Sequence, residues 1–123
     1  MAYVTDRKRA MGSGSAKSGT QHHWHMIVTS CALLLLVPLF IFTFGSALGG
    51  TYEETVEYYS RPWPAVIAAL TIAVSMLHFK SGVQTLIEDY VHGLTGKVLI
   101  IAMICLSYLL LAAGVISVIR LAL

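Results

Sequence analysis

The stretch PAVIAALTIAVSMLHFKSGVQTLIEDY, residues 64–90, is apolar for most of its length and gathers polar groups toward its end. A segment of this length can cross a hydrocarbon core of about 30 Å as a helix. His78 and Asp89 are very nearly three whole helical turns apart, so they share one face at a separation of about 16 Å along the axis. Gly82, one turn from His78, falls on the same face. The stretch therefore predicts a line of groups running from mid-membrane depth to the membrane surface.

Two more apolar segments flank this one, and the three spans are predicted at about residues 26–48, 64–88 and 97–120. The chain of 123 residues is 57% hydrophobic and 11% charged, with a mean hydropathy of +0.77, which excludes an ordinary soluble domain. Backbone groups in lipid must be satisfied internally, and the alternation that a barrel needs is too weak. The sequence predicts an all-α membrane protein with three transmembrane helices in residues 26–123. Residues 1–25 form a tail, whose Gly/Ser-rich first twenty residues should be ordered only if a partner holds them.

The distribution of charge predicts how the chain is oriented. Basic residues cluster before the first span, at Arg7, Lys8, Arg9 and Lys17, and Lys97 follows the second span. The loop between the first two spans is acidic, with Glu53, Glu54 and Glu57 against only Arg61. By the positive-inside rule, the N-terminus is cytoplasmic and the C-terminus lies outside. This orientation suits a bacterial inner membrane, or the mitochondrial inner membrane in a eukaryote.

Two sets of residues allow a metal or disulfide interpretation but favour a simpler one. Three histidines surround Trp24 just before the first span, at His22, His23 and His25. No further ligand stands near them in the sequence, so anchoring at the headgroup level is preferred over a metal site. Cys31 and Cys105 both fall inside predicted spans, where we expect them to be small buried hydrophobic residues.

His78 is the main candidate for chemistry, because an ionisable residue inside a membrane span is costly unless it pairs, ligates or faces water. One interpretation is a hydrogen bond between helices, worth about 1 kcal/mol. The other is axial ligation of haem iron, for which neutral imidazole is a standard ligand. Gly82 favours ligation, because a porphyrin against a helix needs a gap beside its ligand. A second axial histidine would have to come from another chain, since the remaining histidines lie at the boundaries.

The end of the second span offers a second candidate site. Glu88, Asp89 and Tyr90 fall at the membrane boundary, where they could simply mark the helix end. A functional interpretation is that Tyr90 donates a hydrogen bond to a carbonyl while Asp89 handles a proton, which suits a quinone headgroup. Lys80 lies on another face, where it is expected to extend toward the headgroups or to meet an anionic propionate or lipid.

Two motifs carry a resemblance to a known family. The first, Gly14-Ser15-Ala16-Lys17-Ser18-Gly19-Thr20 followed by Trp24, is similar to a G-S-A-K-x-G-T…W pattern. The second, His78-x3-Gly82-x6-Asp89-Tyr90, matches H-x3-G-x6-D-Y. With its three spans, the whole chain resembles the hydrophobic membrane-anchor subunit of succinate dehydrogenase (respiratory complex II), of the D-subunit type found in alphaproteobacteria.

The resemblance implies specific roles. His78 would be an axial ligand of haem b, shared with a histidine of a companion cytochrome b subunit. Tyr90 would hydrogen-bond the substrate ubiquinone, with Asp89 beside it. The flavin and iron–sulfur centres would belong to a flavoprotein and an iron–sulfur subunit, and no nucleic acid is involved. Met26-Ile27 stands where many relatives have Gln-Arg, so the companion subunit would have to supply a basic residue there.

Three alternatives stay open at this stage. An anchor of a quinol:fumarate reductase would share the architecture. A structural anchor without haem would use His78 only for packing. A small proton-coupled transporter would want an acid deep within a span, whereas all acids here lie at or beyond the boundaries.

Overall fold

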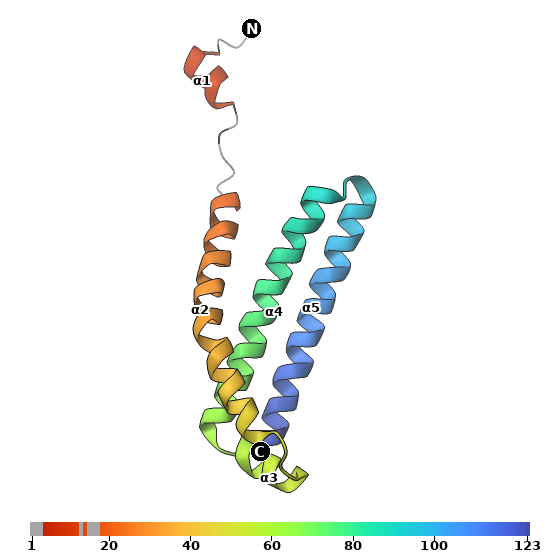
Figure 1. Ribbon diagram of the computed structural model, residues 1–123. Helices are drawn as coiled ribbons and strands as arrows, with labels where there is room; N and C mark the ends of the chain where they lie inside the picture. The colour runs from red at the N-terminus through yellow and green to blue at the C-terminus, as the bar shows by residue number, and fades with distance from the viewer. Residues whose placement is uncertain (1–3, 13, 15–17) are drawn as a thin grey trace.

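The computed structural model describes residues 4–12, 14 and 18–123. It consists of helices joined by short turns, and no strand occurs in these ranges (Figure 1). The helices are α1 (Asp6–Met11), α2 (Ser18–Ala47), α3 (Tyr52–Tyr59), α4 (Pro62–Tyr90) and α5 (Gly93–Ala122). Three segments are long and apolar enough to cross a membrane: Gly19–Ala47, Pro62–Tyr90 and Gly93–Ala122. The predicted all-α fold with three spans is confirmed, while its orientation stays a prediction.

Helix α4 is the centre of the bundle. It packs against α2 on one side and α5 on the other, whereas the backbones of α2 and α5 do not approach each other closely within the described residues. Helix α3 closes the end of the bundle at which the C-terminus lies (Figure 1). A small core forms there, from Tyr59, Ala65, Ala68 and Val118. Most other apolar side chains face outward, including Leu34 and Phe42, both 75% exposed, which is the pattern of a subunit surrounded by lipid or other membrane chains.

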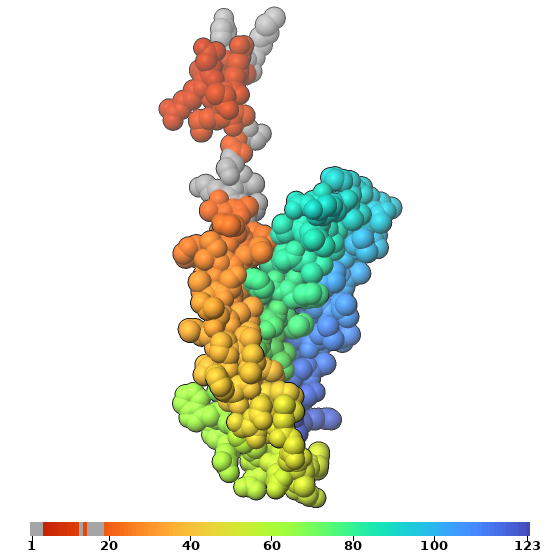
Figure 2. All heavy atoms as spheres, viewed as in Figure 1, coloured from red at the N-terminus to blue at the C-terminus, as the bar shows by residue number. Residues whose placement is uncertain are grey.

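The region before the first predicted span contains helices that the sequence analysis did not predict. Helix α2 begins at Ser18 rather than near residue 26, and residues 6–11 form α1. Thr5 caps α1 by accepting a hydrogen bond from the backbone N–H of Lys8 at 3.3 Å, and Arg, Lys, Ala and Met are strong helix formers. In the space-filling view α1 stands apart from the bundle (Figure 2). The sequence analysis did not predict helix in these segments, and whether a partner holds them stays a prediction.

The acidic loop also contains a helix that the sequence analysis did not predict. Thr51 and Glu54 form a capping box at the start of α3. The backbone N–H of Thr51 donates to Glu54 Oε2 at 2.8 Å, and the N–H of Glu54 donates to Thr51 Oγ1 at 3.3 Å. The spacing Thr-x-x-Glu was the available signal.

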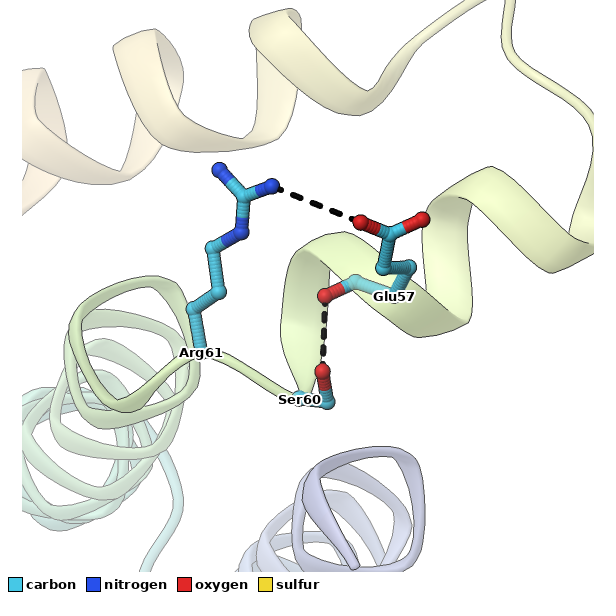
Figure 3. Close-up of polar contacts among 3 residues, drawn as sticks. All are labelled: Glu57, Ser60 and Arg61. Carbon is cyan, nitrogen blue, oxygen red and sulfur yellow. Dashed lines mark hydrogen bonds and ion pairs between the residues drawn. The ribbon is translucent and has the colours of Figure 1, made fainter.

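Polar contacts lie at the end of α3, where the chain turns into α4. The Ser60 hydroxyl donates to the carbonyl oxygen of Glu57 at 2.7 Å, and Arg61 Nη2 lies 3.6 Å from Glu57 Oε1 (Figure 3). Because both charged side chains are exposed, this ion pair contributes little stability. Helix α4 then starts at Pro62, close to the predicted start at Pro64, with prolines in its first turn where they cost no hydrogen bond.

The turn between α4 and α5 depends on glycine. Gly93 has a φ of +74°, in the left-handed region that favours this residue. A Cβ on Gly96 would collide with the carbonyl oxygen of Val91 and lie 3.1 Å from its carbonyl carbon. This close approach places the start of α5 directly beside the end of α4, which carries Asp89 and Tyr90.

The expectation for the two cysteines is wrong. Cys31 on α2 and Cys105 on α5 are both free and exposed on the surface of the chain. Each lies on a side of its helix that faces away from α4, so in the membrane it meets lipid or another chain. The expected absence of a disulfide between them agrees with this arrangement.

Candidate functional site

His78 lies on the side of α4 that faces α2, and it has a partner there. Its Nδ1 atom is 2.9 Å from Oγ1 of Thr29, a hydrogen-bonding distance. Thr29 is only 6% exposed, and its hydroxyl donates to the carbonyl oxygens of His25 at 2.9 Å and Met26 at 3.0 Å. Helix α2 thus presents a buried hydroxyl to the intramembrane imidazole. Among the described residues, no hydrogen bond engages the other ring nitrogen, Nε2.

A second polar pair joins the same two helices nearer the membrane boundary. Nε2 of His22 lies 3.3 Å from Oγ1 of Thr85, whose hydroxyl donates to the carbonyl oxygen of Ser81 at 3.1 Å. His22 precedes Thr29 by seven residues, and Thr85 follows His78 by seven. Seven residues are almost two turns, so the two pairs lie on one seam between antiparallel helices. The sequence analysis treated His22 only as an interfacial anchor and missed Thr29 and Thr85, because the seven-residue spacing pairs them only once the register of α2 against α4 is known.

Gly82 leaves open space beside His78. A Cβ built on this glycine would meet no other atom within 4 Å, whereas Ser81 next to it is only 1% exposed. The surface of α4 is therefore packed at Ser81 and open at Gly82, one turn from the imidazole. These residues fit a flat cofactor that is ligated through a histidine, because one ring nitrogen is held, the other is unengaged within the described chain, and the adjoining helix surface lacks a side chain.

Lys80 is directed to the opposite side of α4. Its Nζ lies 5.5 Å from the centroid of the Tyr108 ring on α5, a cation–π arrangement. The expected extension toward the headgroups is thus replaced by a contact within the bundle. A contact of Lys80 with an anionic propionate or lipid stays a prediction.

At the end of α4 the boundary residues divide between two environments. A cavity of about 330 Å³ lies between the start of α2 and the end of α4, lined by Gly19, His22, Gln84 and Glu88. Within it, the Gln84 side-chain amide donates to Glu88 Oε1 at 2.9 Å. Asp89 and Tyr90 do not line this cavity; both are exposed, Tyr90 to 79%. The sequence analysis did not predict that Gln84 lines this cavity and donates to Glu88.

These observations define the class of protein: a multi-pass helical membrane subunit that holds an imidazole within its central span and groups polar side chains at one boundary. The chain matches the family described as succinate dehydrogenase/fumarate reductase transmembrane subunit over residues 1–116. It therefore belongs to that family, and it serves as a membrane anchor subunit of succinate dehydrogenase, part of the enzyme but not catalytic alone.

Individual relatives agree with this membership. The chain is similar to the succinate dehydrogenase hydrophobic membrane anchor subunit of Paracoccus denitrificans, at 43% identity over 100% of this chain and 95% of the relative. It is also similar to the proteins of that name from Rickettsia bellii, at 30% over 89% of each chain, and Rickettsia conorii, at 32% over 76% of each chain. No solved structure matches the chain. The resemblance found in the sequence is confirmed, and the transporter alternative has no support.

The structure describes the second motif of that resemblance completely and the first only in part. In the first, residues 15–17, including Lys17, lie outside the described residues. The second lies wholly on α4. Its four residues share a helix, but His78 faces α2 whereas Asp89 and Tyr90 are exposed at the helix end.

Proposed function

We propose that this chain, as part of a succinate:ubiquinone oxidoreductase, contributes His78 as one axial ligand of haem b and the Asp89–Tyr90 end of α4 to the ubiquinone site. The observation that carries the haem assignment is the environment of His78, with Nδ1 held at 2.9 Å from Thr29 Oγ1 and no atom within 4 Å of a Cβ at Gly82. Bound haem supplies one-electron redox chemistry, and the part of this chain is to hold one axial position.

The second axial ligand would come from a companion cytochrome b subunit. The other histidines of this chain lie toward helix ends, with His22, His23 and His25 early in α2 and His92 at the start of α5. His22 is already paired with Thr85. Sharing one cofactor between two chains also agrees with the outward-facing apolar surface of α2 and α5, which a second membrane subunit can cover.

Ubiquinone would bind where α4 meets the membrane surface. Reduction of a quinone takes up two electrons and two protons, so its headgroup needs hydrogen-bond donors near water while its tail stays in lipid. Tyr90 offers a phenol hydroxyl and is 79% exposed, which leaves it available to a pocket completed by other subunits. Asp89 beside it would exchange protons with water. Electrons would arrive from a flavoprotein and an iron–sulfur subunit docked on the cytoplasmic side of the inner membrane.

Succinate oxidation is preferred to fumarate reduction as the physiological direction. The relatives from Paracoccus and Rickettsia are all described as succinate dehydrogenase anchors. The family description covers both enzymes, so the direction is tested by comparing succinate–quinone and quinol–fumarate rates of the isolated complex.

The proposal is tested on the detergent-purified complex captured through this chain. We expect mass spectrometry to find a flavoprotein, an iron–sulfur protein and a second membrane subunit, and a dithionite-reduced minus oxidised spectrum to show a b-type haem. His78→Leu should abolish that haem band while the partners remain. An unchanged spectrum in His78→Leu would remove the ligand role from His78, and absence of these partners would overturn the whole assignment.

A further inference from the structure

The hydrogen-bond geometry around Thr29 restricts how His78 can be protonated. A threonine hydroxyl has one hydrogen to donate and two lone pairs to accept with. Three atoms lie near Thr29 Oγ1: the carbonyl oxygens of His25 and Met26, at 2.9 and 3.0 Å, and Nδ1 of His78, at 2.9 Å. Carbonyl oxygens can only accept. The hydroxyl hydrogen therefore has a place on its own helix, as is common for threonine within helices.

With its hydrogen directed to the carbonyls, the hydroxyl faces His78 as an acceptor. Nδ1 of His78 must then carry the ring hydrogen of the neutral imidazole and donate it to Thr29. Neutral imidazole has one N–H, so Nε2 is left with a free lone pair. In the opposite tautomer the hydrogen would sit on Nε2, which could then not ligate a metal, and the Thr29 hydroxyl would have to turn its hydrogen from the helix carbonyls toward Nδ1.

We infer that Thr29 is a positioning residue for cofactor binding: it holds His78 in the Nδ1–H tautomer and so leaves Nε2 free to bind iron. This inference rests on the proposed role of His78 as a haem ligand. Metal-binding histidines usually donate their second ring N–H to an acceptor, which fixes the ring and makes it a stronger ligand. Thr29 supplies that acceptor from a different helix of the same chain.

Two further features keep the pair in place. Thr29 is 6% exposed, so water has little access to replace its hydroxyl. The His22–Thr85 pair, almost two turns away on the same seam, opposes sliding of α2 along α4. A change of one residue in the register between the helices would place Thr29 about 100° around α2, away from His78. The order of the first turns of α2, which the sequence analysis placed in the tail, thus contributes to the geometry of the cofactor ligand.

The test compares variants that differ by a hydroxyl group. Thr29→Val removes the hydroxyl and keeps the side-chain shape, while Thr29→Ser keeps the hydroxyl. The readouts, on the purified complex, are the ratio of haem to flavin, the rate at which haem is lost to a haem-binding acceptor protein, and the midpoint potential of the haem. We expect Thr29→Val to weaken haem retention by about tenfold, the lower end of what loss of such a partner costs. The midpoint potential should rise, because a less basic imidazole stabilises ferric iron less. Thr29→Ser should retain both properties.

Two matched controls separate this role from general packing. Thr43 on α2 also donates to two backbone carbonyls, those of Leu39 at 2.9 Å and Phe40 at 3.1 Å, without a side-chain partner on another helix among the described residues. Thr71 on α4 is equally buried, at 7% exposure, and bonds only to its own helix in the described structure. Thr43→Val and Thr71→Val should leave haem retention and potential unchanged.

The outcomes distinguish this inference from the function on which it depends. If His78→Leu loses haem but Thr29→Val keeps the retention and potential of the parent complex, the positioning role is wrong and the ligand role stands. If His78→Leu keeps the haem, both fail. Should Thr29→Val not assemble, Thr29→Ala and Thr29→Ser provide a second pair of small residues that differ in the hydroxyl alone; equal potentials in that pair would also overturn the inference.

Discussion

Gly114 of α5 lies directly against Ile72 of α4, so close that a Cβ on the glycine would come within 2.8 Å of Ile72 Cγ2 and 3.5 Å of its Cδ1. Small residues let membrane helices approach and gain van der Waals contact. The Cγ2 methyl of isoleucine is attached to the stiff, branched Cβ and cannot easily move aside. This glycine therefore sets the distance between the two helices.

The first prediction concerns Gly114→Ala. The added methyl forces α5 away from α4, and we expect a net loss of about 1 kcal/mol, since overpacking of roughly 1–3 kcal/mol is partly offset by the better helix propensity of alanine. Thermal unfolding of the purified complex measures this. Gly45→Ala on α2 is the control, because a Cβ there meets nothing within 4 Å; it should be neutral or slightly stabilising. Equal effects of the two changes would show that Gly114 does not set the spacing.

The second prediction tests the capping box of α3. Thr51→Ala removes the acceptor for the N–H of Glu54, and N-cap changes of this kind cost about 0.5–2 kcal/mol. We expect earlier proteolysis of the loop between α2 and α4 and a lower unfolding temperature. Thr51→Ser should behave like the parent, because serine is an equally good cap. If Thr51→Ala and Thr51→Ser give the same cleavage rate, the capping box does not stabilise this loop.

The third prediction is a pH dependence at the same end of the molecule. Burial, and next the neighbouring Tyr58, raise the pKa of Tyr59 above its ordinary value of 10.0. The unfolded chain therefore ionises at Tyr59 before the folded chain does, so the contribution of this group to stability is complete below about pH 10 and is lost as the pH rises from there toward the folded pKa. Tyr59→Phe should reduce the alkaline loss of thermal stability measured between pH 8 and 11. Tyr52→Phe, at a 78% exposed position, should not.

The sequence predicted the fold well because three long apolar segments leave few options in lipid. Its errors fall where polar residues form helices. Residues 22–25 were predicted to lie at the membrane boundary before the first span, yet they are part of α2. Thr51 and Glu54 start a helix within a segment that was predicted to be a loop. The length of an apolar segment predicts which part of a helix lies in lipid. It does not predict the polar turns that continue the same helix outside the membrane.

The candidate site was predicted in part. His78 and Gly82 stand out along one helix, because an ionisable residue and a gap are unusual at that depth. Thr29 could not be paired with His78 in the same way, because the register between α2 and α4 is a tertiary property. Many threonines in membrane helices bond only to their own backbone, as Thr43 and Thr71 do within the described part of the chain.

The fourth prediction asks whether the gap at Gly82 is used. Gly82→Ala and Gly82→Leu add side chains where this chain leaves open space, so association with the partner subunits should be retained. If a porphyrin lies there, haem content should fall with side-chain size, with a partial loss for alanine and a near-complete loss for leucine. The haem-to-flavin ratio of the purified complex is the measurement. An unchanged ratio in Gly82→Leu would place the cofactor away from this face.

The fifth prediction concerns the phenol at the membrane boundary. Tyr90→Phe keeps the ring and removes the hydroxyl, and at 79% exposure the change should leave folding and assembly intact. Loss of one hydrogen bond of about 1 kcal/mol to the quinone carbonyl should lower kcat/KM for ubiquinone by about fivefold. Succinate oxidation with a soluble dye that takes electrons before the quinone site should stay at the parent rate, which separates quinone binding from assembly. Tyr52→Phe, at the opposite end of the bundle, controls for the loss of an exposed phenol. Full ubiquinone reductase activity in an assembled Tyr90→Phe complex would mean that the headgroup is held by other side chains, with Gln84 and Glu88 of the neighbouring cavity the next to change.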